Sequence, residues 1–220
     1  MWEHARADWR AFCRALGETE THADRIWTHL FRRLEWNAEV PGISRSLKAA
    51  LAAMDWSLPE VVRRVRAADG SEKLLIRYRD GASVETVWLP IGNRIAQCVS
   101  TQAGCAMGCR FCHTATMGLH RNLSAGEMLA QILLAIRVWG AKPRNLVLMG
   151  MGEPLHNLDA VLKFLAIVTD PKGLAFAPRR ITLSTVGLVP GILRLAELRA
   201  PCHLAVSLHA PNDAIRARLV

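Results

Sequence analysis

The sequence predicts an α/β fold in which a small helical domain and an antiparallel β meander precede a parallel sheet. Three observations lead to this prediction. Apolar residues recur every three or four positions in the first quarter of the chain. Two Asp-Gly pairs then separate runs that alternate apolar and polar residues. Beyond them, short apolar strands alternate with helices, as in parallel βαβ units. We place the three parts at residues 1–57, 58–92 and 93–220.

Residues 1–57 are expected to form helices around a small core. The apolar side chains at helical spacing are Trp2, Trp9, Phe12, Leu16, Ile26, Trp27, Leu30, Phe31 and Leu34. Pro41 and Gly42 interrupt the pattern, and a further helix is expected over 43–54. The tryptophans are predicted to fill the core, with stacking on nucleic-acid bases as the alternative. The opposite face, with Arg25, Arg32 and Arg33, is either solvated surface or a contact to a polyanion.

Residues 58–92 are expected to form a three-strand antiparallel meander. The alternating runs cover 61–67, 73–78 and 84–89, and the pairs Asp69-Gly70 and Asp80-Gly81 separate them. Asp-Gly between alternating runs is a strong hairpin signal. The meander would link the helical domain to the parallel sheet.

The remainder of the chain repeats the order strand, loop, helix. Strands are predicted at 95–100, 145–149, 181–185 and 203–208, and helices from Ser124 to Gly140, at 158–168 and at 190–198. Ser124 and Glu127 have the spacing of a capping box, and Gly140 is a helix-ending residue. The apolar stripe of this helix is Met128, Leu129, Ile132, Leu133 and Ile136. The strand at 145–149 is expected to be buried on both faces.

The charge balance favours a polyanionic partner. The chain has 28 Lys and Arg against 19 Asp and Glu, a net charge of +9, and RNA is the partner that we expect. Its first residues carry charges and lack the apolar stretch of a signal peptide. No run of about 18 uncharged apolar residues predicts a membrane span. We therefore expect a cytoplasmic protein without membrane association, where clustered cysteines indicate a metal site or catalysis.

Three of the six cysteines, Cys105, Cys109 and Cys112, have the spacing C-x3-C-x2-C. Disulfides across such short loops would be strained. A structural zinc ion needs a fourth ligand, and His113 directly follows Cys112, which is poor spacing for one tetrahedron. Three thiolates suit a [4Fe–4S] cluster whose remaining iron is free to bind another molecule. This spacing is the signature of radical S-adenosylmethionine (SAM) enzymes, in which that iron binds SAM.

Polar motifs follow all four predicted parallel strands, at 104–113, 150–154, 184–187 and 207–209. Parallel α/β folds place their sites at these carboxyl ends. From about Val84 to Val220, these motifs resemble the RlmN/Cfr family of radical SAM RNA methyltransferases. The resemblance is closest to the branch that methylates adenine C2 in 23S rRNA and tRNA. It implies a partial (β/α) radical SAM barrel with about four of six units.

The resemblance also assigns roles to individual residues. It implies Cys105, Cys109 and Cys112 as cluster ligands, and as SAM-binding residues Gly152, Glu153, Ser184, Ser207, Leu208 and His209. Glu85 matches the family's proton acceptor, and Cys98 matches an auxiliary cysteine that helps release the RNA. Without the resemblance, Glu85 would be read as an exposed strand residue and Cys98 as an inert buried thiol. In the same way, His209 would be a core histidine and Ser184 a strand end.

The implied reaction uses a 5′-deoxyadenosyl radical from reductive cleavage of SAM, with a reductant such as flavodoxin or ferredoxin. We expect a monomer. The family's methyl-carrying cysteine lies in a C-terminal loop, so the chain ending at Val220 is expected to be truncated and unable to complete methylation. Two alternatives remain. One is another radical SAM enzyme, a C8 methyltransferase or an enzyme with a non-RNA substrate. The other is a non-catalytic RNA-binding module stabilised by a metal.

Overall fold

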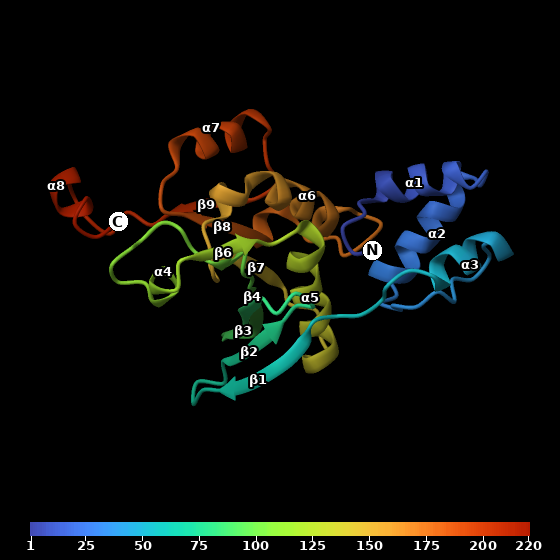
Figure 1. The fold of residues 1–220 in the computed structure, drawn as a ribbon, viewed down its shortest axis with the longest axis horizontal. Helices are drawn as coiled ribbons and strands as arrows, with labels where there is room; N and C mark the ends of the chain where they lie inside the picture. The colour runs from blue at the N-terminus through green and yellow to red at the C-terminus, as the bar shows by residue number, and fades with distance from the viewer.

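One seven-stranded mixed β-sheet forms the centre of the protein in the computed structural model, which describes residues 1–220 (Figure 1). Its strands, in spatial order, are β1 (Glu60–Arg66), β2 (Glu72–Arg77), β3 (Ser83–Ile91), β4 (Arg94–Cys98), β7 (Asn145–Leu148), β8 (Ile181–Thr185) and β9 (His203–Val206). A separate two-stranded sheet consists of β5 (Gln102–Gly104) and β6 (Leu119–Asn122). Strands β1 to β4 pair antiparallel, whereas β4, β7, β8 and β9 pair parallel.

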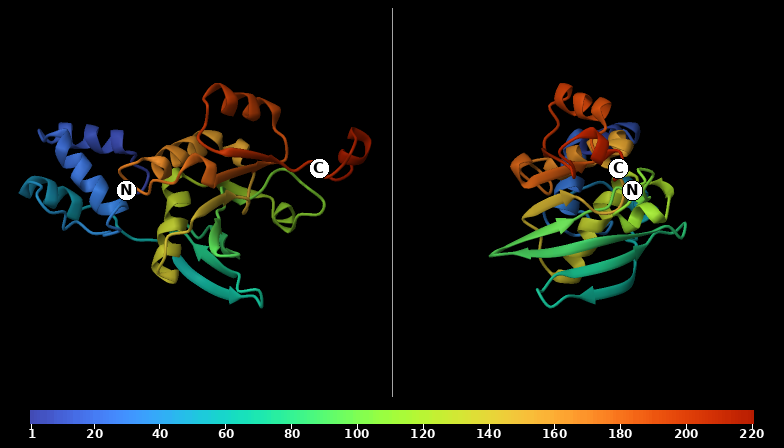
Figure 2. Two further views of the ribbon diagram at one scale, coloured as in Figure 1. Left: turned by 180° about the vertical axis from the view of Figure 1, so that it is seen from behind. Right: turned by 90° about the vertical axis from the view of Figure 1, so that its left-hand side faces the viewer.

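Helices cover one face of this sheet. The α-helices are α1 (Arg6–Ala15), α2 (Glu20–Phe31), α3 (Arg45–Ala52), α4 (His113–Thr116), α5 (Ala125–Trp139), α6 (Leu158–Thr169), α7 (Val189–Glu197) and α8 (Asp213–Arg216). Short 3₁₀ helices, η1 (Pro154–Asn157) and η2 (Pro178–Arg180), precede α6 and β8. Figure 2 shows α5 and α6 between the sheet and the N-terminal helices. None of the helices combines the length and the apolar character needed to cross a lipid bilayer.

The N-terminal helices confirm the predicted helical region and its aromatic core. Trp2, Trp9 and Trp27 are all buried, and the rings of Trp27 and Phe31 meet edge-on with centroids 4.5 Å apart. These indole rings are therefore packed inside the protein and are not free to stack on bases. Leu16 was expected in the same core, but it is 42% exposed because α1 ends one residue earlier.

The meander is confirmed, and it is continuous with the parallel strands. β3 pairs with β4 from Val87 opposite Cys98 to Ile91 opposite Arg94. β4 then pairs in parallel with β7. Each parallel strand is followed by a helix before the next parallel strand begins or the chain ends, which gives the four predicted βα units. The fold is thus a partial (β/α) barrel extended at one edge by the meander.

Helix α5 begins and ends where its sequence predicts. The Glu127 N–H donates to Ser124 Oγ over 3.2 Å, and the Ser124 N–H donates to Glu127 Oε2 over 2.9 Å, which completes the capping box. Gly140 ends the helix with φ of +71°. The whole predicted stripe of α5 is buried against the sheet and α6. Local signals were sufficient here because each cap lies within four residues of its partner.

Ser124→Ala is expected to lower the free energy of unfolding by about 1 kcal/mol, because one N–H of the first turn loses its acceptor. Urea denaturation followed by circular dichroism measures this change. Thr19→Ala is the matched control, since Thr19 precedes α2 but its side chain accepts no hydrogen bond from the helix. Its cost should be about 0.3 kcal/mol or less. Equal losses in the two variants would show that the Ser124 cap contributes nothing.

The other face of the sheet, opposite α5 and α6, is only partly covered, and we call it the open face. Along β7, Leu146 and Leu148 are buried against the helices, whereas Val147 is half-buried and Met149 is 48% exposed. The prediction that this strand is buried on both faces is therefore wrong. Successive side chains of a strand point to opposite faces, and helices cover only one of them here.

Candidate functional site

The four strand-end motifs meet at one edge of the sheet, as predicted. Residues 104–113 follow β4, 150–154 follow β7, 184–187 follow β8, and 207–209 follow β9, all neighbours in the sheet. Figure 1 shows α4, in the first motif's loop, and α8, after the fourth motif, on the same side of the molecule. The carboxyl edge of the parallel strands is therefore the candidate site.

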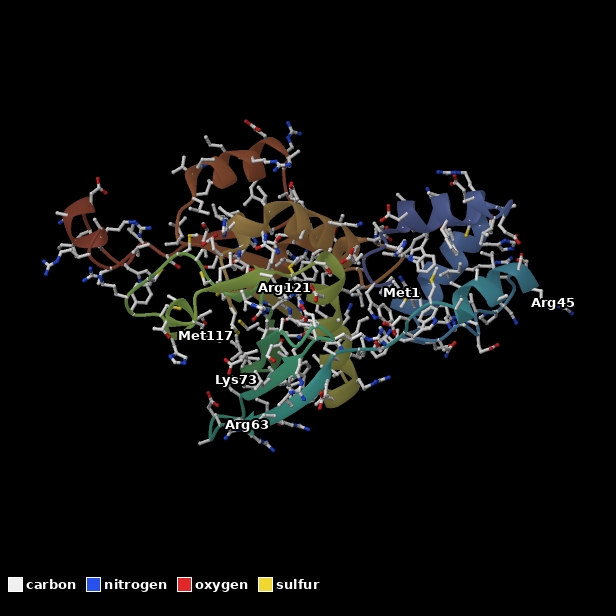
Figure 3. The ribbon with its side chains drawn as sticks, viewed as in Figure 1. Met1, Arg45, Arg63, Lys73, Met117 and Arg121 are labelled. Atoms are coloured by element: carbon white, nitrogen blue, oxygen red, sulfur yellow. The ribbon has the colours of Figure 1, made fainter.

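A hairpin that the sequence did not predict holds the cysteine loop, residues 105–118. Strands β5 and β6 pair antiparallel on either side of it, and the Cys105 N–H donates to the Gly118 carbonyl over 2.9 Å. At the base, the Arg121 guanidinium binds Glu127 at 2.7 Å and Asp80 at 2.5 Å. Figure 3 shows Arg121 near the middle of the molecule, while Met117 marks the loop farther out. The loop thus projects from a fixed base.

The three cysteines of the loop are free thiols. Cys105 is buried, and Cys109 and Cys112 are half-buried. Burial raises the pKa of Cys105 and of Cys109, and repulsion from the neighbouring thiolates raises both pKa values further. The thiols are thus close enough to influence one another's charge.

The donor set fits an iron–sulfur cluster better than a single zinc ion. A structural zinc ion is held by four protein ligands around one point, and the loop offers three thiols. A [4Fe–4S] cluster instead takes its thiolates at separate irons, and thiolate is its usual ligand. Three free thiols on one anchored loop therefore match a cluster in which three irons have protein ligands.

Glu153 connects the loops that follow β7 and β8. Its side chain is buried; Oε1 accepts the Leu155 N–H at 3.0 Å and Oε2 accepts the Val186 N–H at 2.8 Å. Its charge also contributes to the raised pKa of Cys105 and Cys109, after burial and the neighbouring thiolates. Each carboxylate oxygen keeps a second lone pair, so Glu153 can accept a further hydrogen bond from an ammonium group.

A network of buried hydrogen bonds holds the backbone of the loops that follow β4 and β7. Adjacent Gly152 has φ of +100°, and its Cα lies against the side chain of Gln102. The Oε1 atom of Gln102 accepts the Glu153 N–H over 2.8 Å. Helix α5 contributes Gln131, whose amide binds both the N–H and the carbonyl of Ser100, at 2.9 and 2.8 Å. Sequence reasoning missed this network, although a glutamine inside an apolar helix was a signal for it.

The predicted residues after β8 and β9 lie close together. Ser184 Oγ and Ser207 Oγ are 3.4 Å apart, and the Ser207 N–H donates to the Thr185 carbonyl over 2.8 Å. Leu208 is 61% exposed and His209 is exposed as well. The interpretation of His209 as a core histidine is therefore wrong. Its ring instead lies 4.4 Å from the Phe111 ring, which connects this loop to the cysteine loop.

Arg216 was not predicted, yet it joins two of the motifs. Its Nη1 donates to the carbonyls of Ser207 and Leu208 over 2.9 and 2.6 Å, and its Nη2 donates to the carbonyl of Val186. The nearby Leu219 carbonyl accepts the Arg110 N–H over 2.9 Å. The segment around α8 therefore ties β8 and β9 to the cysteine loop. The only sequence signal was an arginine a few residues after a strand-end motif.

Glu85 and Cys98 lie on the open face of adjacent strands. Val87 is opposite Cys98, and Glu85 is two residues from Val87, so the three side chains share a face. Glu85 is partly exposed and forms an ion pair with Lys73 at 2.9 Å. Cys98 is buried, and burial raises its pKa to about 11, although the Met149 N–H lowers it slightly. The structure brings these two residues to one surface.

The raised pKa of Cys98 predicts a distinctive pH dependence of its alkylation. Only the thiolate reacts, so the rate for Cys98 in the folded protein should rise about tenfold between pH 9 and pH 10. An ordinary thiol, with a pKa near 8.5, gains much less over this interval. Iodoacetamide labelling resolved by peptide mass spectrometry measures the rate, and the urea-unfolded chain is the control. A rate for folded Cys98 that levels off at pH 9 would contradict the prediction.

Comparisons with known proteins agree with this geometry. Residues 99–220 match the Radical SAM superfamily. The dual-specificity RNA methyltransferase RlmN 1 of Myxococcus xanthus is 44% identical over 218 residues, covering 90% of this chain and 57% of that protein. The probable dual-specificity RNA methyltransferase RlmN of Alkaliphilus metalliredigens is 53% identical over 203 residues, covering 91% of this chain and 58% of that protein.

A solved structure is similar over the whole chain. The crystal structure of a radical SAM methyltransferase from Sphaerobacter thermophilus superposes with a TM-score of 0.90 at 41% sequence identity. The match covers 100% of this chain and 66% of that one. The chain thus spans 57% and 58% of the length of the two curated relatives described above.

Proposed function

Because this chain belongs to the radical SAM superfamily, we propose that it is part of an RNA methyltransferase that methylates C2 of adenine in 23S rRNA and tRNA. The observation that supports the proposal most is the convergence of four strand-end motifs around a loop with three free thiols. The names of the relatives support RNA as the substrate class. The net charge of +9 favours the same polyanionic partner.

In this proposal the strand-end residues hold a [4Fe–4S] cluster and SAM. Cys105, Cys109 and Cys112 would bind three irons. Glu153 would accept a hydrogen bond from the SAM ammonium group, and the residues available to the rest of SAM are Gly152, Ser184, Ser207, Leu208 and His209. When bound, the reduced cluster supplies the electron that cleaves SAM. The protein positions these groups and keeps water away from them.

We propose that Glu85 and Cys98 act in proton transfer at the adenine of the RNA. The burial that raises the pKa of Cys98 to about 11 keeps a proton on its Sγ near neutral pH. Cys98 would therefore need a base before it could act as a thiolate. The Glu85 carboxylate forms an ion pair with Lys73 on the same face. In this proposal it would accept a proton from an adenine bound there. From the family resemblance, the proposal also includes a cytoplasmic monomer reduced by flavodoxin or ferredoxin.

An anaerobic reconstitution tests the proposed function. The chain is loaded with iron and sulfide, reduced with dithionite, and incubated with SAM and a 23S rRNA fragment or tRNA. Chromatography with mass spectrometry measures 5′-deoxyadenosine and modified adenosines. Formation of 5′-deoxyadenosine supports radical SAM chemistry in this chain. Formation of 2-methyladenosine as well would support the proposed product, and it would contradict the expectation that this chain cannot complete methylation. The product 8-methyladenosine would identify a C8 methyltransferase, and a colourless zinc protein without SAM cleavage would identify a metal-stabilised module.

Arg216→Gln is expected to weaken SAM binding by the reconstituted chain about tenfold. Three carbonyls at the ends of β8 and β9 would lose their donor, at about 1 kcal/mol each before relaxation. Equilibrium dialysis with labelled SAM measures the dissociation constant. Arg218→Gln is the matched control, because Arg218 is exposed and its side chain makes none of these contacts. Equal dissociation constants for the two variants would contradict a positioning role for Arg216.

A further inference from the structure

The opposite edge of the sheet, where the parallel strands begin, carries a cluster of unpaired arginines. Arg94 is the first residue of β4, Arg144 directly precedes β7, and Arg179 and Arg180 directly precede β8. Arg94, Arg144 and Arg179 are exposed, and Arg180 is half-buried. None of these four arginines forms an ion pair. By contrast, most arginines of the meander and the N-terminal helices form one, as do Arg64, Arg77 and Arg121.

The four arginines lie at the same edge of the sheet, at the starts of neighbouring strands. The strand order places β7 between β4 and β8. The Arg144 N–H donates to the Ile95 carbonyl over 2.9 Å, which fixes Arg144 next to the start of β4. Asn145 Oδ1 accepts Nη1 of Arg180 at 3.3 Å, which holds Arg180 against β7. Adjacent strands are about 4.8 Å apart, so the backbone positions of the four arginines lie close together at this edge.

The segments that lead into β4, β7 and β8 carry no acidic side chain. The segments that enter the three strands, residues 92–95, 140–144 and 174–180, contain five basic residues and no Asp or Glu. Burial and the positive charges of Arg144, Arg94 and Arg179 lower the pKa of Arg180, which agrees with an uncompensated cluster. Gathering like charges costs free energy, and a bound polyanion would offset that cost.

We propose that Arg94, Arg144, Arg179 and Arg180 form a phosphate-binding patch, here called the amino-edge patch, that contacts the sugar-phosphate backbone of the substrate RNA. The proposal rests on the proposed function. A cluster of guanidinium groups suits the phosphates of an RNA backbone, since each group can donate two parallel hydrogen bonds to phosphate oxygens. Such contacts position the RNA without reading its bases.

The position of the patch favours RNA over an acidic protein electron donor. An electron donor must approach the cysteine loop, which lies at the carboxyl edge of the sheet. β4 and β8 have five residues each, so about 16 Å of strand separate the two edges. A folded RNA can extend over that distance and contact both edges, whereas a donor seated on the amino-edge patch would lie far from the cysteines.

The test compares RNA affinity at several salt concentrations. The variant R144Q/R179Q removes two exposed charges, and R14Q/R194Q is the matched control with the same charge change at two exposed arginines outside the patch. Fluorescence anisotropy with a labelled 23S rRNA hairpin measures Kd between 50 and about 300 mM salt. We expect R144Q/R179Q to raise Kd about tenfold and to reduce the slope of log Kd against log salt by roughly 1.5 to 2. Circular dichroism checks that both variants are folded.

The outcomes separate the patch from the proposed function. Equal Kd and slope for R144Q/R179Q and R14Q/R194Q would overturn the patch, whatever the chemistry of the enzyme. Loss of flavodoxin-driven cluster reduction with unchanged RNA affinity would overturn it in favour of an acidic protein. SAM cleavage by dithionite without RNA should be the same in the unmodified chain and both variants. If the unmodified chain fails to cleave SAM while the patch variant alone loses RNA affinity, the proposed reaction is wrong and the patch stands.

Discussion

Cys109→Ser is expected to remove the iron–sulfur cluster from the reconstituted chain. A [4Fe–4S] cluster contributes about four irons per chain, and we expect the variant to retain less than about one. Serine is a harder and far more basic ligand than thiolate, so it does not replace the Cys109 sulfur at iron. Colorimetric iron analysis and absorbance near 400 nm measure the loss. SAM cleavage should fall to background in the same samples.

Cys202→Ser is the control for this experiment. Cys202 is half-buried next to β9, as Cys109 is half-buried in its loop, but it is not part of the C-x3-C-x2-C spacing. It should keep the iron content and the absorbance of the unmodified chain. A Cys109→Ser chain that kept about four irons would mean that Cys109 is not a cluster ligand.

Gly104→Ala is expected to disrupt the base of the cysteine loop. Gly104 has φ of +79°, and a Cβ at this position would lie 1.9 Å from the carbonyl oxygen of Gly118. The left-handed conformation alone costs roughly 1–2 kcal/mol for alanine. The overlap is with backbone, so a rotamer change cannot relieve it, and β5 must move away from the Gly118 turn. We expect a total loss of about 3 kcal/mol or more in the free energy of unfolding, together with poor cluster retention.

Gly108→Ala separates the cost of the left-handed backbone conformation from the cost of the overlap with Gly118. Gly108 lies in the same loop with φ of +73°, but a methyl group added to its Cα would have no atom within 4 Å. It should lose only the conformational part, about 1 kcal/mol. Urea denaturation of both variants gives the difference, which isolates the contact with Gly118. If the two variants lose equal stability, the close packing of Gly104 on Gly118 is not present in solution.

The elements that the sequence predicted correctly depend on short-range signals. The strand at 181–185 was predicted with the bounds that the structure has, and α5 with both of its ends. Alternating runs around Asp-Gly predicted the meander. In each case the residues that define the element lie within a few positions of one another, so their chemistry acts before the chain is folded.

The location of the candidate site was also predictable, because it follows from the predicted parallel strands. Parallel strands bring their carboxyl ends to one edge, so a polar motif after each strand was enough to predict that the four would meet. The roles of Glu85 and Cys98 were not predictable in this way. The structure places them together on the open face, but an ion pair with Lys73 and a buried thiol are also compatible with purely structural roles.

The sequence by itself therefore determined the order of the main helices and strands, the capped helix, the hairpins of the meander and the edge at which the cysteine loop lies. Only the tertiary structure decided which strand face is open, how Gln131 holds Ser100, how Arg216 joins β8 to β9, and that unpaired arginines gather at the amino edge. These features join residues far apart in the chain, such as Gln131 and Ser100, which are 31 positions apart. Such contacts form only when strand pairing and helix packing bring distant segments together, so no local pattern encodes them.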